Sequence, residues 1–272
     1  LWSRGLGDVY KRQVMTVHDM IPEVLPKTRR RLDFLSLKRR YVGHVDHVIC
    51  VSEWTRQDLE RIYGPLDVPV TVVHHGVDAI FQPGGAPVAG LPEQYLLHVG
   101  NRGTYKDAQT LVSAFTEIHG DHPDLRLVLV GGGPITKAER AQLDSRGVAS
   151  KVMQVSLPER DMPGAYANAV ACVFPSRYEG FGLPALEAMA CATPLVLSRS
   201  SSLPEIGGEA ARYFTPGDIS DLASNLNDVL IDSERTRRLV ALGLNRAGQF
   251  TWRKSAEQTA QVYRSTIEAY SR

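Results

Sequence analysis

The chain has 272 residues, of which 43% are hydrophobic and 22% are charged, and its formal net charge is +1. The length allows one large domain or two ordinary ones, and the composition is that of a globular protein able to bury a sizeable core. The near-neutral charge gives no electrostatic reason to expect a nucleic-acid partner, and no apolar run approaches the roughly 18 residues of a membrane span. The three cysteines lie far apart in apolar surroundings, which indicates buried free thiols in a reducing, cytoplasmic setting.

The first 13 residues show no apolar period of either 2 or 3.6 residues. A buried strand, VMTV, follows directly and leads into His18 and Asp19. The strands expected in this part of the chain are 14–17, 47–51 and 70–73, and a helix is expected at 52–64. Three strands are about half of the roughly six in a doubly wound domain. We therefore expect 14–80 to be an incomplete Rossmann-like domain.

The rest of the chain alternates regularly between short apolar strands and helices. Strands are expected at 95–99, 125–130, 151–155, 170–174, 194–198 and 212–214, and helices at 108–118, 136–146, within 159–169, and at 184–191, 218–231, 233–248 and 253–270. This alternation predicts the α/β class with a parallel, doubly wound sheet. The Pro- and Gly-rich stretch 81–94 indicates a linker, so we expect a second Rossmann-like domain at 95–250.

Ligands of a parallel, doubly wound sheet bind beyond the carboxyl ends of its strands. The loops expected there are 100–107, 131–134, 156–158, 175–183 and 198–205. The first loop, GNRGTYKD, begins at Gly100 and carries the cations Arg102 and Lys106. The second, GGGP, contains Gly132 and lets the backbone approach a ligand closely because it lacks side chains.

The loop PSRYEGFGL leads into a helix that is expected to begin at Pro184, where a missing N–H costs nothing. Leu183 would then be the capping residue, and its side chain has no oxygen to offer. The backbone amides expected to be partly free are those of Gly182, Leu183, Ala185 and Leu186. A helix start that is uncapped and preceded by glycine is a site for phosphate.

Two glutamates flank this helix start, Glu179 before the turn and Glu187 one turn into the helix. Carboxylates accept hydrogen bonds from sugar hydroxyls, while Arg102 and Lys106 would neutralise phosphates. The ligand that fits carries a diphosphate in the middle and hydroxyls on both sides. A nucleotide sugar, GDP- or UDP-linked, matches that description.

The stretch RYEGFGLPALEAMA resembles the Glu-x7-Glu signature of the retaining glycosyltransferases of family four. The similarity extends over residues 14–271 and includes TVHDMIPE, VSEWTRQDL, VVHHGVDAIFQP, YLLHVGNRGTYKD, LVGGG and SSLPEIGGEAARYF in the family's usual order. It implies the GT-B fold of two Rossmann-like domains, with the helix 251–272 packing back on the first. Within the family, the chain looks most like bacterial mannosyltransferases of surface-polysaccharide assembly.

The resemblance also implies roles for individual residues. Glu187 would bind the ribose hydroxyls and Glu179 the hydroxyls of the donor sugar. Arg102 and Lys106 would bind the diphosphate and support the leaving group, and His18 would reach the donor sugar from the first domain. The other donor-binding residues expected are Gly100, Gly132, Ser156, Leu157, Gly180, Phe181, Gly182 and Leu183, of which Ser156 and Leu157 would touch the base. The catalytic residues expected are His18, Arg102, Lys106 and Glu179.

Two positions depart from the family pattern. Asp107 stands where Asn is often found, and its charge beside Lys106 would either weaken phosphate binding or cap the following helix. Ala192 replaces a usual Gly in MACATP, and the expected effect is on packing alone.

The stretch KTRRRLDFLSLKRR, residues 27–40, is strongly basic and has two interpretations. It is either a solvated helix face or a face toward an anionic membrane or a polyanionic acceptor. The second interpretation would add a peripheral position at the inner face of the membrane to the cytoplasmic location.

Most of an acceptor-side domain usually precedes HDMIPE in this family, whereas only a short segment precedes it here. Residues 1–13 also resemble adapter-derived read-through at the end of an assembled sequence. We therefore expect 1–13 to be a non-native leader and the chain to be an N-terminally truncated fragment, inactive alone.

The resemblance implies that the parent enzyme transfers a hexose, with mannose favoured, from a nucleotide-diphosphate sugar to a saccharide or lipid-linked acceptor with retention of configuration. No metal and no other cofactor is expected, because Arg102, Lys106 and the helix start would supply the positive field. Two alternatives stay open. One is a non-catalytic module that binds nucleotide sugars, and the other is an epimerase or phosphorylase on the same fold.

Overall fold

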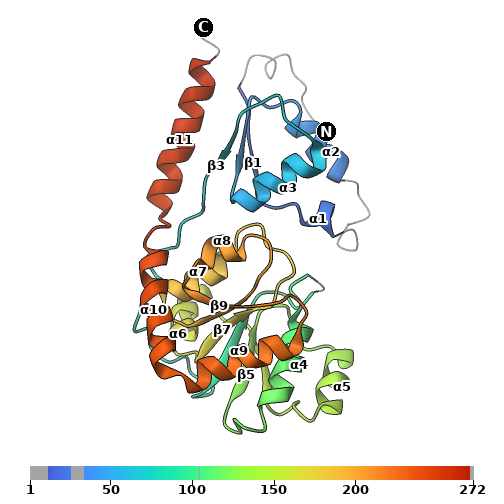
Figure 1. Ribbon diagram of the computed structural model, residues 1–272, viewed down its shortest axis with the longest axis vertical. Helices are drawn as coiled ribbons and strands as arrows, with labels where there is room; N and C mark the ends of the chain where they lie inside the picture. Colours follow the sequence, from blue (N-terminus) through green and yellow to red (C-terminus); the bar gives the residue numbers. More distant parts are fainter. Residues whose placement is uncertain (1–11, 26–33, 104, 270–272) are drawn as a thin grey trace. The chain divides into compact units, whose positions relative to one another are not determined.

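The computed structural model describes residues 12–25, 34–103 and 105–269 (Figure 1). The chain divides into two compact units. One comprises Leu1–Gly76 with Trp252–Arg272, and the other comprises Val77–Thr251. The α/β class with Rossmann-like parallel sheets, predicted from the sequence, is confirmed.

In its described residues, the first unit has a parallel sheet of three strands in the order β1-β2-β3. Its strands are β1 (Val14–Val17), β2 (His47–Cys50) and β3 (Val70–Val72), and its helices are α1 (Ile21–Val24), α2 (Phe34–Val42), α3 (Glu53–Tyr63) and α11 (Trp252–Glu268). Ser52 caps helix α3, because its side chain accepts a hydrogen bond from the Thr55 amide at 3.0 Å.

Helix α11 comes from the end of the chain and packs in the first unit (Figure 1). Val262 of this helix is buried with Ile49 and Val73 from the sheet region. Apolar contact between segments so distant in sequence is what makes α11 part of this unit rather than a free tail.

The second unit contains a fully parallel sheet of six strands in the order β6-β5-β4-β7-β8-β9. The strands are β4 (Tyr95–Val99), β5 (Arg126–Val130), β6 (Val152–Val155), β7 (Ala171–Phe174), β8 (Leu195–Ser198) and β9 (Ala211–Phe214). Each lies within one residue of the span expected from the apolar runs. Their runs are nearly continuous in apolar residues because helices cover both faces of such a sheet.

The helical elements of the second unit are α4 (Ala108–Ile118), α5 (Lys137–Ser145), the 3₁₀ turn η3 (Glu159–Asp161), α6 (Met162–Ala167), α7 (Leu183–Ala190), α8 (Leu203–Gly207), α9 (Ile219–Ile231) and α10 (Ser233–Ala247). The α-helices separate into two groups by what they pack against. One buried cluster joins the sheet to α4, α5 and α9, with Phe115, Leu143 and Leu226 among its members. Helices α6, α8 and α10 pack against α7, which fixes the helix that was expected to bind phosphate.

The segment 81–94, expected as a linker, belongs to the second unit and lies along α6. Phe81 is buried edge-on against the ring of Tyr166. The Asn168 amide donates to the Gly85 carbonyl at 2.8 Å. A Cβ on Gly164 would stand 2.2 Å from the Ala86 carbonyl oxygen, so only glycine admits this approach.

The strand order identifies where a ligand can enter the second unit. From β4 the chain proceeds outward through β5 to β6, and from β7 it proceeds in the opposite direction through β8 to β9. Strands β4 and β7 are nevertheless neighbours, so the crevice beyond their carboxyl ends is a topological switch point. The loops that border it are 100–107, after β4, and 175–182, after β7.

Within the described ranges, no helix is both long enough and apolar enough to cross a bilayer. Of the basic stretch 27–40, residues 27–33 lie outside the described residues. Lys38, which is described, donates to the Asp19 carbonyl at 2.9 Å and pairs with Glu23 at 3.0 Å. This cation therefore serves an internal contact, whereas Arg40 is exposed.

Ala192 follows α7 directly and has a φ of 63°, in the left-handed region. This conformation costs a residue with a Cβ about 1–2 kcal/mol. The expectation that replacing the usual Gly affects only packing was therefore wrong, because the substitution also strains the backbone.

We expect Ala192→Gly to raise the free energy of unfolding by about 0.5–1 kcal/mol, since relief of strain is partly offset by the greater entropy of glycine in the unfolded chain. Urea unfolding measures the change. Ala190→Gly is the matched control, because Ala190 is helical and its loss should lower stability by about 1 kcal/mol. Equal destabilisation by both substitutions would contradict the strain at Ala192.

Candidate functional site

An ion pair lies at the switch point. Lys106, from the loop after β4, donates through Nζ to both carboxylate oxygens of Glu179, from the loop after β7, at 2.7 and 3.0 Å. The two side chains are only 14% and 11% exposed. Such a shielded pair couples the two loops. It can open for a ligand that offers an anionic group to Lys106 and hydrogen-bond donors to Glu179.

Helix α7 begins directly behind this pair without a side-chain cap. Gly182 is the capping residue, with a φ of 103°, and Leu183 is the first helical residue. The sequence expectation was one residue off, because Pro184 occupies the second helical position rather than the first. The amides of Ala185 and Leu186 are also not free, since both donate to the Gly182 carbonyl. Within the described part of the chain, the Gly182 and Leu183 amides have no acceptor.

Glu187 lies one turn into α7, and its carboxylate accepts a hydrogen bond from the Tyr166 hydroxyl at 2.7 Å. Burial raises the pKa of Glu187 above its ordinary value, and the Tyr166 hydrogen bond opposes that rise. The bond to Tyr166 orients the carboxylate and engages one of its two oxygens. Sequence reasoning missed Tyr166, because a tyrosine on an apolar helix face carries no signal beyond core packing.

Serines from the loop after β8 hold the loop that carries Glu179. The Ser201 hydroxyl accepts from the Glu179 amide at 2.7 Å, and the Ser202 hydroxyl lies 3.0 and 2.8 Å from the Glu179 and Phe181 carbonyls. Ser200 similarly donates to the Arg177 carbonyl. The sequence signal for these contacts is the run SRSSS at the end of a strand. Serine hydroxyls there can bond to backbone groups of a neighbouring loop that no helix or strand pairs.

Asp107 occupies the cap position of α4, but its side chain does not cap the helix. Its backbone is left-handed, with a φ of 49°, and its side chain makes no capping bond. Its carboxylate instead accepts from Arg177 Nε at 2.9 Å. Asp107 thus ties the loop after β4 to the loop after β7, the capping alternative is wrong, and the effect of its charge on phosphate binding stays a prediction.

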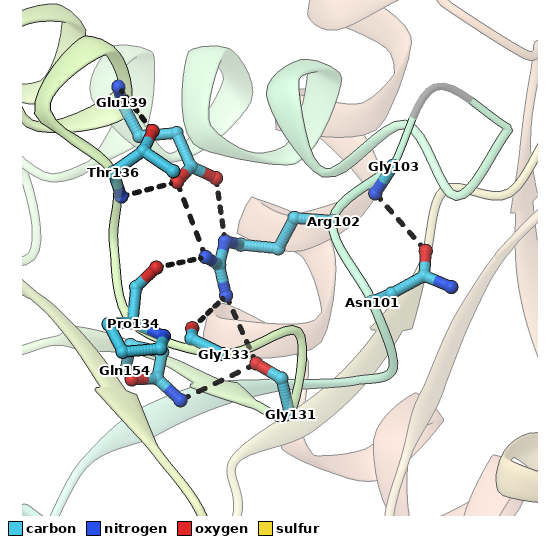
Figure 2. A network of polar contacts seen from close by, with 9 residues as sticks. All are labelled: Asn101, Arg102, Gly103, Gly131, Gly133, Pro134, Thr136, Glu139 and Gln154. Atoms are coloured by element: carbon cyan, nitrogen blue, oxygen red, sulfur yellow. Dashed lines mark hydrogen bonds and ion pairs between the residues drawn. The ribbon is translucent and has the colours of Figure 1, made fainter.

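Arg102 is not bonded to the Lys106–Glu179 pair. Figure 2 shows its guanidinium among the carbonyls of the glycine-rich loop after β5 and the carboxylate of Glu139 on α5. Arg102 and Glu139 also line a cavity of about 130 Å³ together with Val112 of α4 and Leu143 of α5. Arg102 and Lys106 therefore pair with different carboxylates, and their expected contacts with the diphosphate stay a prediction.

The remaining expected donor contacts lie around the same edge of the sheet. Gly100 and Gly132 follow β4 and β5 in left-handed conformations, while Gly180 and Phe181 are buried in the loop before α7. Ser156 and Leu157 follow β6, two strands away from β4. His98 on β4 is fully buried, and burial lowers its pKa, so it adds no charge here at neutral pH.

His18 belongs to the first unit and follows β1. Its ring stacks on that of His75, which follows β3, with the ring centroids 5.5 Å apart and the planes 18° apart. His75 in turn contacts Trp252 at the start of α11, at 5.4 Å. Burial lowers the pKa of His75, and the neighbouring histidines act in the same direction. Sequence reasoning singled out His18 but neither the His75 ring that stacks on it nor Trp252, which contacts His75.

Comparison with known proteins decides the family. Residues 88–265 match the family described as glycosyl transferases group 1, and residues 9–80 match glycosyltransferase family 4. The first match alone spans more than half of the chain. This chain is a group 1 glycosyltransferase.

The group 1 chain is similar to several curated relatives. It is 31% identical to the O-antigen chain mannosyltransferase B of Escherichia coli over 93% of this chain and 70% of that protein. It is also 31% identical to the MMP α-(1→4)-mannosyltransferase of Mycolicibacterium hassiacum over 89% of this chain and 59% of that protein. A glycogen synthase of Mycobacterium tuberculosis shares 31% identity, and the chain spans 55% of its length.

Solved structures of known glycosyltransferases have the same fold as this group 1 chain. Sucrose-phosphate synthase from Thermosynechococcus elongatus superposes with a TM-score of 0.80 and 27% identity, over 94% of this chain and 68% of that one. Anabaena HepE, solved in complex with UDP and glucose, gives a TM-score of 0.83 over 95% of this chain and 73% of that one. At 20% identity, the second likeness shows the GT-B fold alone.

Proposed function

We propose that this chain binds a nucleotide-diphosphate sugar and belongs to an enzyme that transfers the hexose to a saccharide or lipid-linked acceptor. Mannose is the favoured hexose. The observation that carries the proposal is the shielded Lys106–Glu179 pair at the switch point, directly before the free amides of α7. Two of the relatives reported above are mannosyltransferases by name, which supports the choice of mannose.

The diphosphate is the part of the donor that would open the ion pair. Its oxygens offer Lys106 a stronger anionic partner than the single carboxylate, and the Gly182 and Leu183 amides at the start of α7 add two donors. Glu179, released from Lys106, would then accept hydrogen bonds from hydroxyls of the donor sugar. Each partner exchanges one buried contact for another, so neither charged group is left without a hydrogen-bonding partner.

Glu187 is proposed to bind the ribose hydroxyls. Tyr166 already engages one carboxylate oxygen, which leaves the other to accept from the nucleotide. Because ribose is present in both the donor and the nucleoside diphosphate product, this contact would contribute to the binding of both.

The transfer itself is proposed to proceed with retention through front-side attack on the donor. Negative charge develops on the leaving diphosphate, and Lys106 and the α7 amides are placed to stabilise it. In this proposal that positive field replaces a metal ion. His18, held by His75, would contact the donor sugar from the first unit.

Titration calorimetry of the chain with GDP and UDP tests the proposal. We expect one of the two to bind, and its mannose or glucose conjugate to bind as well. The corresponding monophosphate is the control and should bind more weakly, because it lacks the second phosphate. Absence of binding by both diphosphates would reject the donor site, and inversion at the anomeric carbon of a transfer product would reject retention.

A further inference from the structure

The loops after β4 and β7 are joined by more than the Lys106–Glu179 pair. Arg177, in the loop after β7, makes two further contacts with the loop after β4. Its amide donates to the Tyr105 carbonyl at 2.7 Å, and its Nε donates to Asp107 Oδ2 at 2.9 Å. Arg177 therefore contacts the residues on both sides of Lys106.

The Arg177 contacts do not depend on the ion pair that a donor would open. In the proposed function, the diphosphate takes Lys106 from Glu179, so the bond between these two side chains is lost. Keeping a released loop ordered costs conformational entropy. The Arg177 contacts involve neither the Lys106 ammonium nor the Glu179 carboxylate. They can therefore hold the two loops together in the bound state.

Asp107 has a backbone conformation that needs such support. Its φ is 49°, in the left-handed region that residues other than glycine adopt only occasionally and at a cost. The Lys106 and Asp107 amides both donate to the Gly103 carbonyl, at 3.0 and 3.2 Å. Asp107 therefore ends the turn that carries Lys106, and fixing Asp107 fixes that end of the turn.

The Asp107 carboxylate is also an anion close to the proposed phosphate site. It is only 9% exposed and follows Lys106 directly in the chain. Without a cationic partner it would repel a diphosphate and compete for the Lys106 ammonium, and shielding from water would strengthen both effects. Arg177 pairs with this carboxylate and cancels its charge. The pairing lets Asp107 anchor the turn without opposing the anion that Lys106 is proposed to bind.

We propose that Arg177 and Asp107 are positioning residues for Lys106. Arg177 keeps the turn that carries Lys106 against the loop after β7 while the diphosphate replaces Glu179, and it cancels the Asp107 charge beside that anion. This inference rests on the proposed function and adds to it the residues that prepare Lys106 for the donor.

A double-mutant cycle on affinity separates this role from direct contact between Arg177 and the ligand. Arg177→Gln should weaken binding of GDP or UDP, whichever binds the unaltered chain, by about fivefold or more, because it leaves the Asp107 carboxylate without its cation. In the Asp107→Asn background, the same substitution should cost less than about twofold, because no charge is left to cancel. An equal loss in both backgrounds would show that Arg177 acts by touching the ligand, and no loss in either would show that it has no part in binding. Both results would overturn the proposal.

Arg177→Lys is the conservative variant in the same titration. The pair with Asp107 is a hydrogen bond from Nε, which a lysine ammonium can replace as a point charge. Affinity should therefore stay within about twofold of that of the unaltered chain. A loss as large as that of Arg177→Gln would overturn the charge-cancelling role.

Arg199→Gln is the matched control. Arg199 is an exposed arginine that follows β8 at the same edge of the sheet and lies over the Tyr213 ring, 4.9 Å from its centroid. Its loss should leave affinity unchanged. A loss equal to that of Arg177→Gln would reduce the effect to general surface charge and reject the proposal.

Urea unfolding of the ligand-free chain tests the ion pair without any nucleotide. Arg177→Gln should lower the unfolding midpoint, and it should lower it less in the Asp107→Asn background. Equal shifts in both backgrounds would overturn the pair as the means by which Arg177 acts. If the midpoints behave as stated but neither GDP nor UDP binds the unaltered chain, the ion pair stands, and the proposed function and the role of Arg177 in it are rejected.

Discussion

Lys106→Ala is expected to weaken nucleoside diphosphate binding by about 1.5–3 kcal/mol, or roughly 10- to 150-fold, the scale of hydrogen bonds to a charged group. Lys106 is the cation bonded to Glu179 at the switch point, at 2.7 Å, and it is largely shielded from water. Shielding strengthens its attraction for phosphate relative to that of a surface lysine. Calorimetry with whichever of GDP and UDP binds the unaltered chain measures the loss.

The control for this prediction is Lys151→Ala. Lys151 lies in the same unit and precedes β6 at the amino ends of the strands, and its Nζ donates to the Pro123 carbonyl. Its loss should leave affinity unchanged. Lys106→Ala also leaves Glu179 buried without its partner, so thermal unfolding must accompany the titration. The double variant Lys106→Ala with Glu179→Gln removes that unpaired charge. Unchanged affinity in the double variant would remove Lys106 from the site.

The strand-end placement of the site could be predicted from the sequence, and the reason is topological. Apolar runs alternating with helices specify a parallel sheet, and the carboxyl ends of parallel strands meet at one edge. That reasoning needs no side-chain geometry. It brought the loops of Lys106 and Glu179 together although the two residues are 73 positions apart in sequence.

The partners of individual side chains could not be predicted in the same way. Arg102 and Lys106 share one loop, yet Arg102 bonds to Glu139 on α5 and Lys106 to Glu179 before α7. Which direction each long side chain takes depends on the rotation of the neighbouring helices, and no sequence spacing encodes that rotation. The Tyr166–Glu187 bond escaped prediction for the same reason, since it joins α6 to α7.

Backbone conformation was the other feature that could not be predicted from the sequence. The one-residue difference at the start of α7 follows from Gly182, whose left-handed φ of 103° makes it the capping residue in place of Leu183. Ala192 is left-handed although alanine usually avoids that region, and Asp107 is left-handed in a region that aspartate visits only occasionally. Such positions are set by the packing around them rather than by local preference.

Glu187→Ala and Glu179→Ala are expected to affect different ligands. Glu187→Ala should weaken the binding of the nucleoside diphosphate and of the nucleotide sugar alike, by about 1–3 kcal/mol, because the ribose is common to both. Glu179→Ala should weaken only the binding of the nucleotide sugar. Because the substitution also releases Lys106 from its ion pair, the variant should bind the sugar-free diphosphate more tightly than the unaltered chain does, by about 1 kcal/mol.

The Glu187 assignment is tested further by comparing a nucleoside diphosphate with its 2′-deoxy form. If Glu187 accepts from the ribose hydroxyls, the unaltered chain prefers the ribose form and Glu187→Ala loses that preference, because the coupling between the two changes isolates their contact. Tyr166→Phe should reduce the preference without abolishing it, since Tyr166 orients Glu187 but leaves its charge in place. Equal losses for both ligands in Glu179→Ala and Glu187→Ala would show that the two glutamates do not divide the donor between them.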